Sequence, residues 1–162
     1  MKGPRTGIKK AIDTARDPYL NKLAPGDKAV CTKCGSVYKD KRWTVKSAAA
    51  AGAPGAVEVT CPACQKIRDK YADGYVTLSG EFLAEHKDEI LNLIRNKEER
   101  SMHTNPLHRI IEIKEREGTI EITTTTDKFA QRIGQMLKKT FSGEVEYKWS
   151  DDVKLVRVFW TR

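Results

Sequence analysis

The C-terminal third of the chain alternates between apolar and polar residues. On either side of Glu117–Gly118, two isoleucines stand two positions apart: Ile111 and Ile113 before it, and Ile120 and Ile122 after it. A spacing of two places these side chains on one face of a strand, and the glycine between the two runs permits a tight turn. The pattern predicts two paired strands, the second of which continues into the threonine run Thr123–Thr126.

A helix and two further strands complete this region. From Asp127 to Ser142–Gly143 the apolar spacing changes to three and four, which predicts a helix capped by Asp127. Its predicted inner face consists of Phe129, Ala130, Ile133, Met136 and Leu137. Alternation returns in Val145–Trp149, and a largely apolar strand follows in Val153–Trp160. We therefore expect a ββαββ domain at residues 106–162, a four-stranded sheet with one helix on one face.

A short strand and a long amphipathic helix precede that domain. Tyr75–Leu78 predicts the strand, and Ser79 is a suitable N-cap for a helix over approximately Gly80–Arg100. The apolar residues of this helix recur near spacings of three, four and seven: Phe82, Leu83, Ile90, Leu91, Leu93 and Ile94. Because Ser101–Pro106 interrupts the pattern, we expect residues 75–105 to connect two domains.

The first 27 residues are poor in large apolar side chains and contain several glycines and prolines. Ile8–Arg16 has the pattern of a short helix, but alone it buries too little surface to become ordered. We interpret residues 1–27 as a basic flexible arm that orders on a partner, with a frayed, solvated terminus as the alternative. Further along, Ser47–Ala56 is nearly all alanine, glycine and proline, which predicts a mobile loop between short strands.

Two Cys-x-x-Cys pairs stand in residues 28–74, with 26 residues between them: Cys31-Thr-Lys-Cys34 and Cys61-Pro-Ala-Cys64. Two turns of this spacing supply four soft thiolate ligands in the closed tetrahedron of a structural zinc site. Gly35 follows the first pair, where a tight turn often requires positive φ. Redox pairs usually stand alone at a helix start, and catalytic zinc keeps an open position, so both are disfavoured. The sequence predicts a zinc ribbon at residues 28–74, with an iron centre on the same sulfurs as the alternative.

The charge of the chain is positive and unevenly distributed. Its 162 residues contain 30 Lys and Arg against 22 Asp and Glu, a net charge of +8, and residues 1–74 contribute all of this excess. A lopsided basic half indicates a polyanionic partner, most often a nucleic acid. Near the cysteines the cations are interleaved with aromatic residues, which can stack on unpaired bases. The predicted nucleic-acid contacts in this half are Lys9, Lys10, Lys33, Lys39, Lys41, Arg42, Trp43, Lys66, Arg68 and Lys70.

The helix predicted after Asp127 offers a second set of cations off its apolar stripe: Lys128, Arg132, Lys138 and Lys139. A solvated polar face is an equal alternative for this helix. Near the cysteines, the alternative is that Tyr38, Trp43 and Tyr71 pack the core of the ribbon while the cations are only solvated.

Several classes of function are disfavoured. No apolar run approaches the roughly 18–20 residues that span a bilayer, and no signal-peptide pattern follows the basic N-terminus, so we expect a cytoplasmic protein without membrane contact. In a reducing compartment the cysteines are metal ligands rather than disulfides. No nucleophile set, paired carboxylates or phosphate-binding glycine loop stands out, so we expect neither enzymatic activity nor a small-molecule substrate.

The cysteine pairs and the elements that follow them resemble a known family. The segments Cys31–Gly35, Val59–Cys64 and Ala72–Gly80, with the helix and the ββαββ tail, are similar to the large-ribosomal-subunit export adaptors of eukaryotes and archaea. The resemblance covers residues 28–160 and is to a reduced, bacterial-type form. Because family members bind the large ribosomal subunit, it implies a ribosomal partner. The adaptors carry more Cys-x-x-Cys pairs, further domains and, in eukaryotes, transport signals, so an export role is not implied.

These observations predict a non-enzymatic zinc-binding protein of the α+β class that binds ribosomal RNA or the ribosome. Assembly, quality control and stress-related silencing of the ribosome all fit such a protein. Two other classes stay open: a DNA-binding or transcription-associated zinc ribbon, and a protein-interaction adaptor whose ribbon is only a scaffold.

Overall fold

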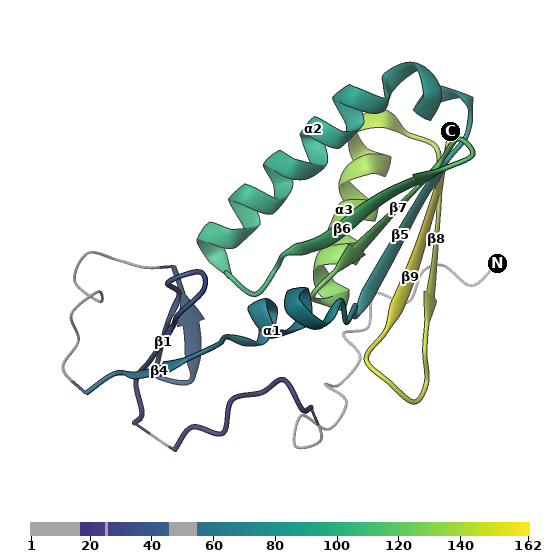
Figure 1. Cartoon of the computed structure of the whole chain (residues 1–162). Helices are drawn as coiled ribbons and strands as arrows, with labels where there is room; N and C mark the ends of the chain where they lie inside the picture. Colours follow the sequence, from purple (N-terminus) through teal and green to yellow (C-terminus); the bar gives the residue numbers. More distant parts are fainter. Residues whose placement is uncertain (1–16, 25, 46–54) are drawn as a thin grey trace.

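The computed structural model describes residues 17–24, 26–45 and 55–162, and this part of the chain forms two β-sheets and three helices. The smaller sheet has the order β3-β2-β1-β4 and is built from β1 (Ala29–Cys31), β2 (Val37–Lys39), β3 (Arg42–Thr44) and β4 (Val57–Val59). Helix α1 (Pro62–Asp69) follows and leads into the larger sheet (Figure 1). The predicted α+β class is confirmed.

The larger sheet has five strands in the order β6-β7-β5-β9-β8. They are β5 (Gly74–Ser79), β6 (Ile110–Arg116), β7 (Thr119–Thr124), β8 (Glu144–Trp149) and β9 (Val156–Thr161). Helices α2 (Glu81–Thr104) and α3 (Asp127–Phe141) lie on the same face of this sheet (Figure 1). Apart from β8, the chain order is the β-α-β-β-α-β arrangement.

The position of β5 corrects the expected four-stranded sheet. The elements predicted for residues 106–162 occur in the predicted order, but β5 lies in the middle of their sheet, antiparallel to β7 and parallel to β9. The reason is burial: Val76 and Leu78 of β5 are 0% exposed and need a strand on each side and helices above them. The sheet therefore crosses the boundary expected after residue 105.

Both large helices begin differently from the prediction. Gly80, not Ser79, is the N-cap of α2, because the backbone there has φ 107° and a Cβ would lie 2.1 Å from the Arg162 carbonyl oxygen. Ser79 instead places its hydroxyl 3.0 Å from that of Thr161 across the sheet. In α3 the cap is Thr126, whose hydroxyl accepts a hydrogen bond from the Phe129 N–H at 3.2 Å.

Other predicted features of the larger sheet are confirmed. The tight turn at Glu117–Gly118 has positive φ at both residues, which matches the twist of a two-residue hairpin. Helix α3 ends at Ser142 and buries the predicted face, with Met136 partly buried at its edge. In contrast, α2 extends four residues into the predicted break Ser101–Pro106 and ends at Thr104, with Ser101 buried inside the helix. No helix in the described ranges is long and apolar enough to cross a membrane.

Residues 17–24 lie against the smaller sheet and α1 rather than apart from them. Asn21 Nδ2 donates to the Thr60 carbonyl at 3.1 Å, and the rings of Tyr19 and Tyr71 are 5.0 Å apart. Leu23 packs on the core of the smaller sheet. The predicted helix Ile8–Arg16, with Lys9 and Lys10, and most of the loop Ser47–Ala56 lie outside the described residues.

The central place of β5 makes a testable prediction. A fragment of residues 71–162 contains all five strands and both large helices, so we expect a cooperative thermal transition by circular dichroism. A fragment of residues 106–162 lacks β5, which leaves β7 and β9 without the neighbour that they share, so we expect no such transition. A cooperative melt of the shorter fragment at the same temperature would contradict the importance of β5.

Candidate metal centre

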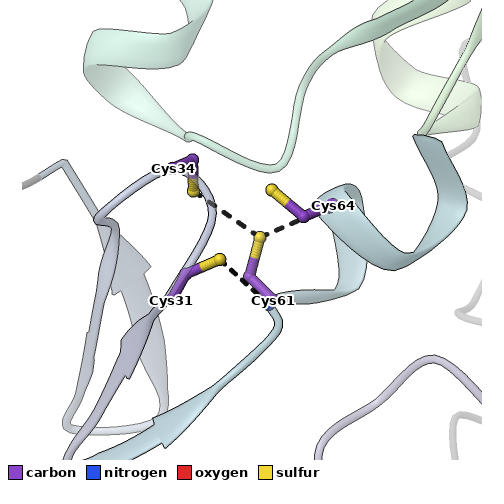
Figure 2. Close-up of side chains that lie close together, drawn as sticks. All are labelled: Cys31, Cys34, Cys61 and Cys64. Atoms are coloured by element: carbon purple, nitrogen blue, oxygen red, sulfur yellow. Dashed lines mark hydrogen bonds between the residues drawn. The ribbon is translucent and has the colours of Figure 1, made fainter. Parts of the chain in front are cut away.

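The first cysteine pair lies in a tight turn between β1 and β2. The Gly35 N–H donates to the Cys31 carbonyl at 3.0 Å, and the Cys31 N–H donates to the Ser36 carbonyl at 2.8 Å. Gly35 has φ 76°, the left-handed conformation in which a glycine is favoured, as the sequence predicts. This turn directs the side chains of Cys31 and Cys34 toward the second pair (Figure 2).

The second pair starts a helix instead of forming a second β-turn, which departs from the predicted zinc ribbon. Cys61 is the N-cap of α1, with extended backbone at φ −65° and ψ 160°, and Pro62 occupies the first helical turn. Proline is favoured there because the missing N–H has no helical partner and its φ suits a helix. The dipeptide Cys61-Pro62 is therefore a helix-start signal, which the predicted zinc ribbon does not take into account.

The four sulfur atoms converge on one point. All four Sγ atoms lie within 4.8 Å of one another, and those of Cys34 and Cys61 are 3.8 Å apart (Figure 2). A tetrahedron with metal–sulfur bonds of about 2.3 Å has sulfur–sulfur edges of about 3.8 Å, whereas a disulfide bond is about 2.05 Å. The cysteines are free thiols, and two of them are buried. This arrangement can hold a metal ion.

The surroundings of the sulfurs act on the charge of the thiols in opposite directions. The Cys61 N–H donates to Cys31 Sγ at 3.3 Å, and the Cys64 N–H donates to Cys61 Sγ at 3.4 Å. The hydrogen bond between the Cys34 and Cys61 side chains lowers the pKa of Cys34 to about 4 and raises the pKa of Cys61. Burial raises the pKa of Cys64 to about 11. A bound divalent cation replaces these thiol protons, so metal binding releases protons.

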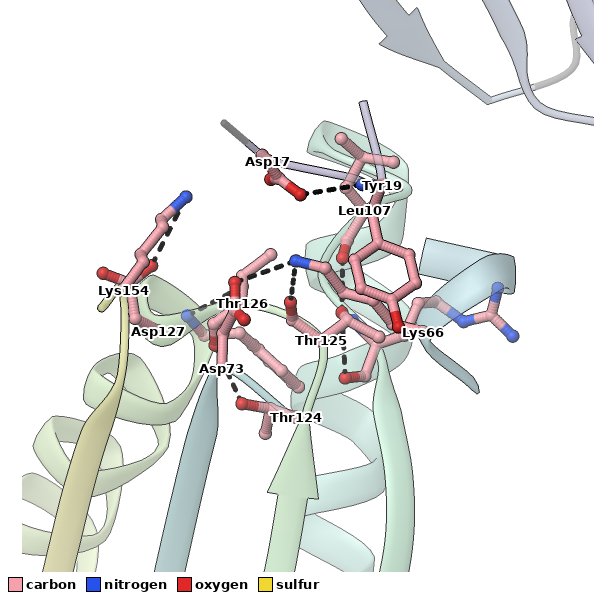
Figure 3. Close-up of polar contacts among 12 residues, drawn as sticks. Asp17, Tyr19, Lys66, Asp73, Leu107, Thr124, Thr125, Thr126, Asp127 and Lys154 are labelled. Atoms are coloured by element: carbon pink, nitrogen blue, oxygen red, sulfur yellow. Dashed lines mark hydrogen bonds and ion pairs between the residues drawn. The ribbon is translucent and has the colours of Figure 1, made fainter. Parts of the chain in front are cut away.

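Lys66 is not a nucleic-acid contact, because its ammonium group is buried. It is 6% exposed, in the last turn of α1, and Nζ lies 2.8 Å from Asp73 Oδ2 and 3.0 Å from the Thr125 carbonyl (Figure 3). Burial raises the pKa of the Asp73 carboxyl, and the neighbouring ammonium opposes this effect. The predicted phosphate contact at Lys66 is wrong: this lysine joins α1 to the larger sheet.

Trp43 is likewise a core residue. It is 7% exposed and packs in the small cluster that also contains Ala29, Cys31, Cys61 and Ala63. A side chain this buried does not stack on a base, which corrects the predicted contact and agrees with the packing alternative; the small part that stays exposed lines the groove described next. Its neighbour Tyr38 is only partly buried, with the two rings 5.4 Å apart.

The structure brings four of the remaining predicted cations together. Lys41 and Arg42, in the β2–β3 hairpin, and Lys128 and Arg132, on α3, line one groove of about 580 Å³ together with Tyr38 and Leu107. We call this the basic groove. No aspartate or glutamate is among its lining residues, and none of the four cations makes an ion pair within residues 17–24, 26–45 and 55–162.

The other predicted cations lie outside this groove. Lys33, Lys39, Lys70, Lys138 and Lys139 are exposed elsewhere, and Arg68 pairs with the adjacent Asp69 at 2.8 Å. Sequence reasoning missed Asp73, the buried partner of Lys66, and His108, which lines the groove. Backbone hydrogen bonds to Thr124 and Val156 place Asp73, and a side-chain hydrogen bond to Thr126 places His108, so no local pattern marks either residue.

Comparison with protein-family models, with curated proteins and with solved structures finds no match. The resemblance to ribosomal export adaptors therefore stays a prediction. The geometry itself provides a four-sulfur centre at the start of α1 and, beside it, a groove lined by four cations.

The metal centre predicts the effect of removing one ligand. If the four cysteines hold a metal, Cys61→Ser should lose it and unfold the smaller sheet, because Cys61 supplies one of the four sulfurs, caps α1 and is part of the small core. The larger sheet has its own core and should keep its cooperative melt. Elemental analysis and hydrogen exchange would measure both effects. Wild-type metal content in this variant would contradict the proposed ligand set.

The buried ion pair gives a second prediction. Lys66→Met leaves the Asp73 carboxylate buried without its partner, so we expect the free energy of unfolding to fall by about 3–5 kcal/mol. Adding Asp73→Asn removes the unpaired charge and should restore part of that loss. Denaturant unfolding of the single and double variants tests this. If the double variant is less stable than Lys66→Met, with no recovery of the free energy of unfolding, the ion pair does not join the two sheets as described.

Proposed function

We propose that the four cysteines hold one structural zinc ion and that the protein is a non-enzymatic, ribosome-associated RNA-binding protein. Four thiolates form a closed tetrahedral set, which suits zinc and leaves no position for a substrate. When bound, the ion would supply a rigid link between the β1–β2 turn and the start of α1. An iron centre on the same sulfurs would absorb visible light, so elemental analysis and an absorption spectrum separate the two metals.

The single observation that carries RNA binding is the basic groove. Four cations from two distant segments line it, and it has no acidic lining residue. Positive charge concentrated in a concave surface attracts a polyanion and raises its local concentration. The surplus of positive charge in the first 74 residues supports the same conclusion at longer range.

The choice of ribosomal RNA rests on the resemblance to ribosomal export adaptors. A cytoplasmic protein that binds ribosomes by charge needs neither a catalytic site nor a small-molecule substrate. Roles in ribosome assembly, quality control or silencing are all compatible with such a protein, and each begins with the same binding step.

Binding to ribosomes predicts a steep salt dependence. If about six phosphates are contacted, the affinity should fall roughly a thousandfold between 50 and 200 mM salt. Co-sedimentation of the purified, metal-loaded protein with separated ribosomal subunits across a salt series would measure this. The Cys61→Ser variant is the comparison, since it keeps every lysine and arginine while it removes one of the four sulfurs.

Three results would contradict the proposal. Absence of the protein from both subunit fractions at low salt removes the ribosomal partner. Stronger competition by double-stranded DNA than by ribosomal RNA favours a DNA-binding protein. Binding to a protein partner that survives high salt, together with no RNA binding, favours an interaction adaptor.

A further inference from the structure

We infer that the basic groove is a binding site for a single-stranded RNA segment, shared between the metal-held hairpin and α3. The inference rests on the proposed function, because it names the form of RNA and the residues that contact it. The two pairs of cations are separated by more than eighty positions in the chain, yet they line one groove. Neither pair was predicted to lie beside the other.

The groove suits a single strand better than a duplex. Its volume of about 580 Å³ lies in the range of sites for small ligands, and duplex RNA is too wide to enter a site of that size. Partly buried Tyr38 and Leu107 contribute apolar surface between the cations. A single strand has phosphates for the cations and exposed bases for this apolar surface, whereas the bases of a duplex are stacked inside.

Two of the four cations stand where the fold alone would not favour them. Lys41 has φ 63° in a two-residue hairpin turn, a position in which glycine is preferred. Lys128 lies in the first turn of α3, where the positive end of the helix dipole repels a cation. Both side chains face the groove, so a contribution to binding explains residues that local stability does not.

The hairpin half of the groove depends on the metal centre. Arg42 is adjacent to Trp43, which packs with Cys31 and Cys61 in a core of only five buried residues. A core of that size does not keep a hairpin folded without a cross-link such as a bound metal ion. Loss of the metal should therefore remove Lys41 and Arg42 from the site while α3 keeps its place on the larger sheet.

His108 provides a reporter inside the groove. It is 4% exposed, and burial together with the nearby Arg132 and Lys128 lowers its imidazole pKa to about 4. Of the other charged groups nearby, Asp127 raises the His108 pKa and Lys154 lowers it further. Phosphates bound by Arg132 and Lys128 would offset their effect, so RNA in the groove should raise the His108 pKa.

The experiment compares two matched double variants of the full-length, metal-loaded protein. Lys128→Gln with Arg132→Gln removes the α3 half of the groove. Lys148→Gln with Arg157→Gln removes the same charges from the opposite face of the larger sheet, because these residues alternate with Tyr147 and Val158, which face α3. The probe is a fluorescent oligouridylate of about ten nucleotides, measured by anisotropy across a salt series.

We expect the groove variant to bind roughly tenfold more weakly than the wild type, while the affinity of the control stays within about twofold of the wild type. The slope of log affinity against log salt concentration should become less steep by about 1.4 in the groove variant. Equal losses in both variants would overturn the site and indicate diffuse attraction. Duplex RNA or inorganic polyphosphate that competes as well as the single strand would overturn the role of the bases. An unchanged His108 pKa, followed by NMR titration with saturating probe, would also count against the groove.

A third variant separates binding from folding. Lys41→Gly should keep or raise the thermal midpoint, because glycine suits the turn, and should weaken oligouridylate binding about threefold. Unchanged binding by this variant, or full affinity in Cys61→Ser, would overturn the metal-dependent half of the site. If the wild type binds ribosomal subunits but no groove variant differs from its control, only this inference fails. If the wild type binds no RNA at all, the proposed function fails as well.

Discussion

The convergence of four cysteine sulfurs is the constraint on which the smaller half of the molecule depends. The strands of the smaller sheet are three residues each, and the core around them contains five buried residues, two of which are the cysteines themselves. Apolar burial on that scale cannot offset the entropy of ordering the segment. Four ligand bonds to one ion would, and they would fix the hairpin and the start of α1 with the same interaction.

Helix α1 transmits this constraint to the larger sheet. Its first residues follow Cys61 at the metal centre, and Lys66 at its other end reaches Asp73, just before the central strand β5. The same ammonium group binds the Thr125 carbonyl, which lies between β7 and α3. A buried ion pair adds little net stability over an apolar contact, but it requires one arrangement of its partners. Here that arrangement fixes the orientation of the metal centre relative to α3.

Much of the fold could be predicted from local pattern, and the exceptions have physical reasons. Periodicity identifies Ile113, Ile120 and Ile122, the turn at Glu117–Gly118 and the inner face of α3, because these depend on neighbours in sequence. A shift in register between Ile110 and Glu112 places Ile110, rather than the predicted Ile111, against the core. The place of β5 in the middle of the sheet depends on pairing with strands that begin more than forty positions later, which no local pattern contains. The cap of α2 was missed because the choice of Gly80 depends on the carbonyl of Arg162, at the opposite end of the sequence.

In the candidate site, too, features built by local turns could be predicted, and features that depend on burial could not. The cysteine spacing predicted a four-sulfur centre, because two short local turns suffice to build it. Lys66 and Trp43 were predicted to contact nucleic acid because cations alternate with aromatic residues near the cysteines, and the burial of both side chains contradicts this.

The groove shows most clearly what spacing cannot supply. The hairpin places Lys41 in a backbone conformation that disfavours side chains, and α3 places Lys128 at its positively polarised end. Each position weakens its own element slightly, and no acidic side chain in the described residues pairs with either cation. A sequence selected only for stability would place a glycine at the first and an acid at the second. Both exceptions line the same groove although they come from elements far apart in the sequence, and an anionic ligand in that groove accounts for this.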